Sequence, residues 1–476
     1  MALASAPRSH PKVPLEHCLI WTSSRERARA AALLAVGRGE PGQSAGRERE
    51  REESERGLSP KAGLRKITAP GWARRLDDAV LAELVDEASF RYDQRLFQAS
   101  SPSGSRDGTR LALARIEGVL DATVQGLVEC GPRAWDAADA ALNQPTPGLA
   151  YTVARVLFEA QQIERAALAI RAHAAAGAAY AEAATLAIGH AEPSGAASAG
   201  IVLEWLDAGP PSAALALKIA AQNQLPVPLA RLRAANDALS DDAVADAAAW
   251  LAALGTLGHP EALAIIGRWQ FSRHERLRRC WALTALLVGG VEGEALVRAR
   301  LDQDPAVILP AALCIDRAGA RSFRELAAKL SGPDACLALG LSGDAQAVPH
   351  LLDCLNDAAR AEAAARALEL LLGEAPVSKA RAPGPDDEAA PGILAAPSLD
   401  AGAWGELARP IVAQHPVDVR LRGGAVASPM STLALLERLH LPRRVRRYLA
   451  CELRVRWKAS HLLDVDGLLR QQSAAR

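Results

Sequence analysis

The feature that most constrains the fold is a helical hairpin that recurs along the middle of the chain. One copy runs from Asp242 to Trp269, where apolar residues fall three and four apart on both sides of the turn Gly258-His259-Pro260. The clearest copy occupies Ala335 to Leu355, with its turn at Gly343-Asp344. One hairpin of this kind cannot cover its own apolar side, so neighbouring hairpins have to stack.

One apolar anchor marks the second helix of each repeat, after a break such as Gly289-Gly290, and we expect the anchors to face one continuous interior. Successive anchors lie 25 to 34 residues apart. The anchors are Leu168, Ile201, Leu229, Leu263, Leu296, Phe323 and Val348. A period of this length with two helices per unit is typical of an α-solenoid. The predicted fold class is all-α: an α-solenoid of HEAT-like or armadillo-like helix pairs, with a small helical C-terminal unit.

Composition agrees with closely packed helices and narrows the range of partners. Half of the 476 residues are apolar but only 4% are aromatic, and alanine, the best helix former, dominates the regular stretches. Lysine plus arginine and aspartate plus glutamate number 55 each, so the formal net charge is zero. A protein that binds nucleic acid or membrane surfaces over its whole face usually carries an excess of positive charge. We therefore expect no membrane partner.

The pattern changes at three places and so predicts four segments. Residues 1–78, with the charge run Arg47–Arg56, are predicted to be disordered, or to be an N-terminal extension that is not natively translated, which intact-mass measurement of the native protein would decide. Residues 79–372 form the predicted solenoid. Residues 373–403, which hold five prolines, are predicted to be a linker, and residues 404–476 a small helical C-terminal unit.

The seven cysteines lie far apart in the sequence and are odd in number, which indicates reduced, mostly buried thiols and a cytoplasmic protein. No stretch approaches the roughly 18 uncharged apolar residues of a membrane helix. The glycines of Gly37–Gly42 match a dinucleotide-binding fingerprint but lack its strand and helix, and Asp464–Gly467 lacks the later ligands of a calcium loop. We expect no cofactor, no metal and no catalytic residues.

Two basic stretches are candidate partner-binding sites. The first comprises Arg273, Arg276, Arg279 and the neighbouring Trp281, a combination that can hold a phosphate and stack on a base. The alternative is that the arginines form the solvated face of a helix while Trp281 packs inward.

The second stretch is Arg443, Arg444, Arg446 and Arg447, which follow Pro442 at a predicted helix N-terminus, where the helix dipole disfavours positive charge. That placement indicates an anionic partner. The partner is either another molecule or acidic residues of this chain, for which the linker cluster Asp386-Asp387-Glu388 is a candidate.

These features resemble the HEAT-like repeat proteins, and more closely an uncharacterised family of proteobacterial proteins that carry such repeats between distinctive ends. The resemblance covers residues 80–472 and rests on Asp86–Phe90 with Arg95, on Leu113–Glu117 through Cys130-Gly131, and on the tail Arg446–Gln472. The chain departs from the family pattern at Ser89 and Arg91, where apolar residues are usual. The resemblance implies the fold but no established activity, and some members of the family are encoded near type VI secretion genes.

The predicted function is a non-enzymatic scaffold that holds another protein or peptide on the concave face of the stack. The alternative is a nucleic-acid-binding or DNA-glycosylase-like HEAT-repeat protein, whose groove would be lined by Trp250, Trp269, Trp281 and the arginines of residues 273–279. A positive groove that exposes tryptophans beside a carboxylate would favour the alternative, and a neutral groove would favour the scaffold.

Overall fold

The computed structural model describes residues 77–373 and 398–459, with gaps at 101–105, 142–145, 192–194, 210–211, 224, 260, 417–418 and 438–440, together with Leu462 and Val465. Within these residues the chain is almost entirely helical, which confirms the all-α prediction. The strands described there, β1 (Leu421–Arg422) and β2 (Ala425–Val426), form one short antiparallel hairpin. The predicted disorder or non-translation of residues 1–78 falls almost wholly outside the described residues, as does most of the predicted linker.

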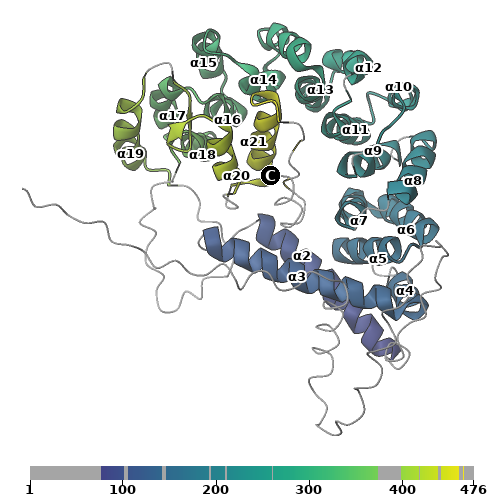
Figure 1. Ribbon diagram of the computed structural model, residues 1–476. Coiled ribbons are helices and arrows are strands. Elements are labelled where there is room, and N and C mark those ends of the chain that lie inside the picture. Colours follow the sequence, from purple (N-terminus) through teal and green to yellow (C-terminus); the bar gives the residue numbers. More distant parts are fainter. Residues whose placement is uncertain are drawn as a thin grey trace, which may run out of the picture.

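An inner row of helices runs around the arc seen in Figure 1, each helix in contact with the next in chain order. The row consists of α5 (Pro147–Glu159), α7 (Ala178–His190), α9 (Ser212–Gln222), α11 (Val244–Leu257), the first half of α13 (Glu275–Leu301), α14 (Ile308–Cys314), α16 (Pro333–Ser342) and α18 (Ala361–Leu372). Successive inner helices begin 25 to 34 residues apart, the period expected from the sequence.

An outer row of helices alternates with the inner row along the chain and packs against it. Its members are α6 (Ile163–Ala176), α8 (Gly195–Asp207), α10 (Leu229–Ala238), α12 (Ala262–Ile266), the second half of α13, α15 (Ala320–Lys329), α17 (Val348–Cys354) and α19 (Ala401–Ala413). Short 3-10 turns, η3 (Gly267–Phe271), η4 (Pro305–Val307) and η5 (Ala345–Ala347), adjoin α12, α14 and α17.

Each predicted anchor lies in a different helix of the outer row, but the anchors do not share one interior. Phe323 and Val348 are buried, whereas Leu168 is 64% exposed and Leu296 is 39% exposed. The prediction was wrong for these two leucines because the continuous core lies mainly along the inner row, where nearly every residue of α16 and α18 is buried.

Three helices open the described chain: α2 (Asp78–Ser100), α3 (Arg106–Cys130) and α4 (Pro132–Ala141). Helix α2 packs against α3, α4 and α5. The two departures from the family pattern have polar contacts here, since the Ser89 hydroxyl lies 3.3 Å from that of Thr146, and Arg91 pairs with Glu87 one turn away.

Helix α13 is not one continuous rod. Gly290, with φ 50° and ψ −128°, breaks it into two halves at the turn that the sequence predicted. Among the described helices, α13 alone is long and apolar enough to cross a membrane, but half of its most apolar stretch is buried inside the protein. The break leaves neither half near the roughly 20 residues that cross a bilayer, which is compatible with a soluble protein.

Small residues allow the inner helices to approach closely. Gly340 of α16 faces Ala367 of α18, and a Cβ at residue 340 would lie 2.6 Å from the Ala367 Cα and 2.8 Å from its Cβ. Neither neighbour is the flexible end of a long side chain, so the two helices would have to move apart to admit a methyl group.

Gly340→Ala is therefore expected to lower the free energy of unfolding by roughly 1–3 kcal/mol, because the added methyl group overpacks the α16–α18 contact. The control is Gly118→Ala in α3, whose Cβ would meet no atom within 4 Å. It should raise stability by up to about 1 kcal/mol through helix propensity. Urea unfolding measures both, and equal effects of the two substitutions would contradict the close approach.

Candidate functional site

The inner side of the arc holds a segment from near the end of the chain. Residues 419–459, here called the closing segment, comprise β1, β2, α20 (Pro429–Leu436) and α21 (Arg443–Val455). Helix α21 contacts α13 and α14, and β1 contacts α18 (Figure 1). Helices are thus present in the C-terminal unit predicted at residues 404–476, and α20 and α21 lie on the surface that we expected to be open to a partner.

The closing segment lies where inner helices end. The last four carbonyls of any helix have no partner within that helix, and they carry the negative end of its dipole. The hairpin supplies backbone donors to two such ends. Gly423 and Gly424 donate to Leu370 O and Leu371 O of α18, at 2.9 and 2.8 Å, and Leu421 donates to Gly343 O just after α16, at 2.8 Å.

Arginines of the closing segment supply the remaining donors. Arg422 donates to Gly340 O and Leu341 O at the end of α16, at 2.8 and 2.7 Å. Arg456 donates to Ala312 O of α14 at 2.9 Å, and Arg420 donates to Ile315 O directly after that helix. Arg454 donates to Leu287 O of α13 at 3.4 Å. One segment reaches the end of the first half of α13 and the ends of α14, α16 and α18, so these ends lie on the same side of the inner row.

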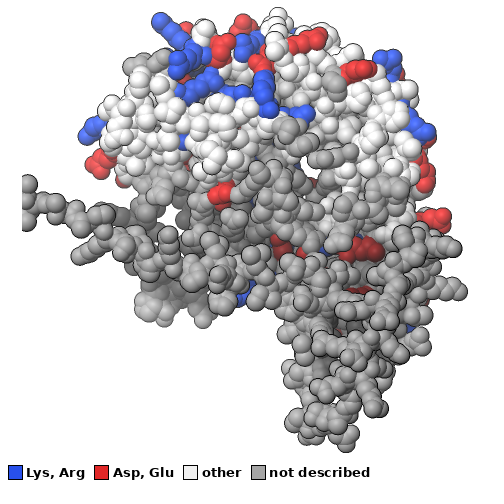
Figure 2. All heavy atoms as spheres, in the orientation of Figure 1, with Lys and Arg blue, Asp and Glu red and all other residues white. Residues whose placement is uncertain are grey.

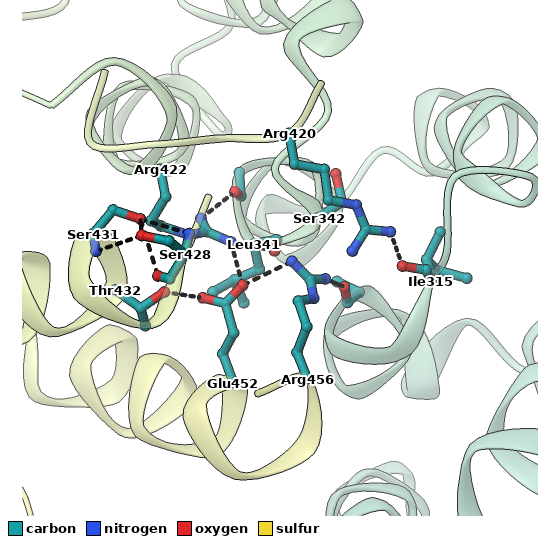
Figure 3. A network of polar contacts seen from close by, with 12 residues as sticks. Ile315, Leu341, Ser342, Arg420, Arg422, Ser428, Ser431, Thr432, Glu452 and Arg456 are labelled. Carbon is teal, nitrogen blue, oxygen red and sulfur yellow. Dashed lines mark hydrogen bonds and ion pairs between the residues drawn. The ribbon is translucent and has the colours of Figure 1, made fainter. Parts of the chain in front are cut away.

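A buried ion-pair network lies at the centre of the closing segment (Figure 3). Arg422 and Glu452 are 2.8 Å apart and both side chains are fully buried. Glu452 also pairs with Arg456 at 2.7 Å and accepts a hydrogen bond from Thr432 at 3.4 Å. Burial lowers the pKa of Arg456 to about 10 despite the neighbouring Glu452 carboxylate. The guanidinium therefore remains charged near neutral pH.

The arginines predicted at the start of α21 form ion pairs with inner helices. Arg443 and Arg447 lie 3.0 and 3.6 Å from Glu182 of α7. Arg444 lies 3.0 Å from Asp334 of α16. Arg446 is buried and donates to Val465 O at 3.4 Å. The anionic partner that we inferred from the helix N-terminus is thus present within the chain, while the candidate cluster of residues 386–388 lies outside the described residues.

The first basic stretch is divided between surface and core. Arg273 is 68% exposed and pairs with Asp242, and Arg276 is also exposed. Arg279 pairs with Glu275 at 2.6 Å.

Trp281 is buried, as the inward-packing alternative predicted, so it is not placed to stack on a base. Arg279 also lies 2.8 Å from Asp334, the residue that pairs with Arg444, so the structure brings the two predicted stretches together at one carboxylate. Binding of an external partner at their exposed arginines stays a prediction.

The other tryptophans assigned to a nucleic-acid groove are also in the core. Trp250 and Trp269 are no more than 2% exposed. The indole of Trp269 donates to the Asn236 side chain at 2.8 Å, and Arg268 lies over its ring. The nucleic-acid alternative placed these tryptophans on a groove, whereas their side chains belong to the buried core.

The sequence did not single out four residues that matter here: Arg420, Arg422, Glu182 and Asp334. Arg420 and Arg422 come directly before the Gly423-Gly424 turn. Two arginines at alternate positions before a Gly-Gly pair were the available signal for a hairpin that carries both on one strand. Glu182 and Asp334 are single acids within apolar helices and carry no comparable signal.

A second polar cluster links the first helices of the described chain. The Tyr151 hydroxyl accepts a hydrogen bond from Arg155 at 2.8 Å and lies 2.9 Å from His190 Nδ1. Arg155 pairs with Asp121 at 2.6 Å, and the Tyr92 ring stacks on Tyr151 with centroids 3.9 Å apart. The cluster therefore cross-links α2, α3, α5 and α7 inside the protein.

Among the described residues, no group of three or more His, Cys, Asp or Glu side chains is arranged to hold a metal ion. Comparison of the chain with protein-family models, with curated proteins and with solved structures found no match.

Replacing Arg422 by Ala should lower the free energy of unfolding by roughly 3–5 kcal/mol, because the buried Glu452 loses one of its partners. It also leaves two α16 carbonyls without their donor. The control is Lys458→Ala, which removes a 61%-exposed partner of Glu294 and should cost about 1 kcal/mol or less. Denaturant titration compares the two variants. A loss for Arg422→Ala as small as the control's would show that the network and its carbonyl contacts do not stabilise the fold.

Alkaline pH should destabilise the fold. Burial raises the pKa of Cys451 from 9.0 to about 12 and that of Cys130 from 9.0 to about 11. It also raises the pKa of Tyr151 and Tyr448 from 10.0 to about 12. Because the folded state holds these protons more tightly, the stabilisation is complete below about pH 9 and is lost as the pH rises towards about 12. Unfolding midpoints that stay constant from about pH 8 to about pH 11 would contradict this prediction.

Proposed function

We propose that this chain is a non-enzymatic protein-interaction scaffold, built as an α-solenoid of HEAT-like or armadillo-like helix pairs. The two alternating rows of helices and their period of 25 to 34 residues support the solenoid assignment. Repeat stacks of this kind present extended surfaces that bind other polypeptides. The resemblance to the proteobacterial family supports the same fold. An association with type VI secretion rests on that resemblance and on no other observation.

One observation carries the proposal: the inner side of the arc already binds a helix. Helix α21 lies on four inner helices, with Glu182 of α7 and Asp334 of α16 near its N-terminal half and carbonyls of α13 and α14 near its C-terminal half. The carboxylates and carbonyls of this surface are spaced to bind the cations of one helix of this chain. The same groups can bind a helix of another protein. The partner that we propose is therefore a protein or peptide on the inner side.

The nucleic-acid alternative has less support. The three tryptophans that would line its groove are buried. On the face seen in Figure 2, basic side chains gather near α14 and α15, and acidic side chains lie beside them, so the basic group is small and partly neutralised. Cytoplasmic location is part of the proposal and is supported by free, mostly buried cysteines, including Cys130, Cys314 and Cys451.

Site-specific photo-crosslinking in the native host tests the scaffold. A photoreactive residue replaces Arg447 on the inner side in one variant and Leu168 on the outer row in a control; the two side chains are 52% and 64% exposed. We expect one discrete crosslinked protein at position 447 and none at 168. The purified partner should then bind the unmodified chain in solution.

Two outcomes would contradict the proposal. Crosslinks at position 168 alone would place the partner on the outer row and refute the inner-side site. If no protein crosslinks at either position while duplex DNA binds at about 0.15 M salt, the nucleic-acid alternative replaces the scaffold.

A further inference from the structure

We propose that the inner side of the arc is a receptor for basic amphipathic helices, that the closing segment is its resident ligand, and that a partner helix bearing arginines at the spacing of α21 takes its place. This inference rests on the proposed scaffold function and names the partner's chemistry. It is carried by the juxtaposition of the α21 cations with acceptors from successive inner helices.

The acceptors recognise positive charge at fixed intervals. Glu182 and Asp334 bind the arginines of the first turns of α21, and Glu294 binds Lys458 just beyond its end at 2.8 Å. Between them, the carbonyls of Leu287 and Ala312 bind cations near the end of α21. Every helix end has free backbone carbonyls, whatever its side chains are. This part of the receptor therefore recognises positive charges placed at helical spacing.

Apolar contacts supply the second half of the match. Val445, Leu449, Leu453 and Val455 of α21 are buried, on a helix that begins with four arginines in five residues and that packs against α13 and α14 as well as against α20 of its own segment. A helix that lacks this apolar stripe would gain only the exposed ion pairs, which contribute little. The receptor therefore selects a helix that is both basic and amphipathic.

The buried ion pairs of the closing segment are all formed within the segment itself. Arg422, Thr432, Glu452 and Arg456, the members of the buried network, all belong to residues 419–459. When the segment leaves the surface, these pairs stay together and no buried charge is stranded in the inner row. The contacts that must break are carbonyl hydrogen bonds, apolar contacts and ion pairs of partly exposed side chains such as Arg444, Arg447 and Lys458, which are 50%, 52% and 61% exposed.

The experiment uses the full chain with a protease site inserted between residues 417 and 418, ahead of β1. Circular dichroism and co-elution of the two fragments at low salt check that the cut protein keeps its fold. A fluorescent peptide of residues 419–459 is the probe, and the matched control peptide carries Arg443→Glu, Arg444→Glu and Arg447→Glu. Fluorescence anisotropy follows binding to the cut and uncut chains.

We expect the probe to bind the cut chain and to bind the uncut chain at least about 100-fold more weakly, because the tethered segment competes at a high effective concentration. The control peptide should bind the cut chain at least about tenfold more weakly than the probe, since it repels Glu182 and Asp334. If cutting alone releases the segment, the probe should bind the empty surface directly.

Three results would overturn the inference. Equal binding of the probe to cut and uncut chains would place it on another surface. Absence of exchange after cutting, even at high salt, would make the closing segment a permanent part of the core. Dimers of the uncut chain joined through position 447 would make a second copy the occupant. A protein partner crosslinked at position 447 alongside a failed exchange would leave the scaffold standing and refute only the basic-helix receptor.

Discussion

The ends of the inner helices set the main constraint on this structure. Helices that alternate between two rows must run the same way within each row, so the carbonyl ends of α14, α16 and α18 lie on one side. Each end has acceptors that its own helix cannot satisfy, and burying such groups without donors is costly. The closing segment meets this need with the backbone of its hairpin and with Arg420, Arg422 and Arg456. Much of the remaining architecture follows from that arrangement.

The same arrangement explains why the end of the chain is so rich in arginine. A guanidinium can donate to several carbonyls and to a carboxylate at once, as Arg422 does to Gly340 O, Leu341 O and Glu452. A buried ion pair adds little net stability over an apolar contact, but it fixes one register of packing in some proteins. Here it joins β1 to α21 inside the closing segment.

The sequence was sufficient for the helical class, the period and the two hairpins that it singled out, because these depend on local apolar spacing and on turns such as Gly258 and Gly343. The helix N-terminus at Pro442 also correctly implied an anionic partner for the arginines that follow. Local pattern could not indicate that Leu168 and Leu296 face solvent, since either side of an alanine-rich helix can serve as its buried side. It offered both a buried and a groove-lining position for Trp281, and only the packing of distant helices decides between them. The pairing of Arg443 with Glu182 spans 261 residues and has no local signature.

The central claim is that arginines of the closing segment cap the inner helices, and amide hydrogen exchange of an Arg456→Met variant tests it most directly. Arg456 donates to Ala312 O, in the last turn of α14. The account predicts faster exchange at the end of α14 and in α21, with protection of α5 and α7 unchanged. Exchange at the end of α14 that matches the unsubstituted protein, or a uniform loss of protection throughout the chain, would contradict it.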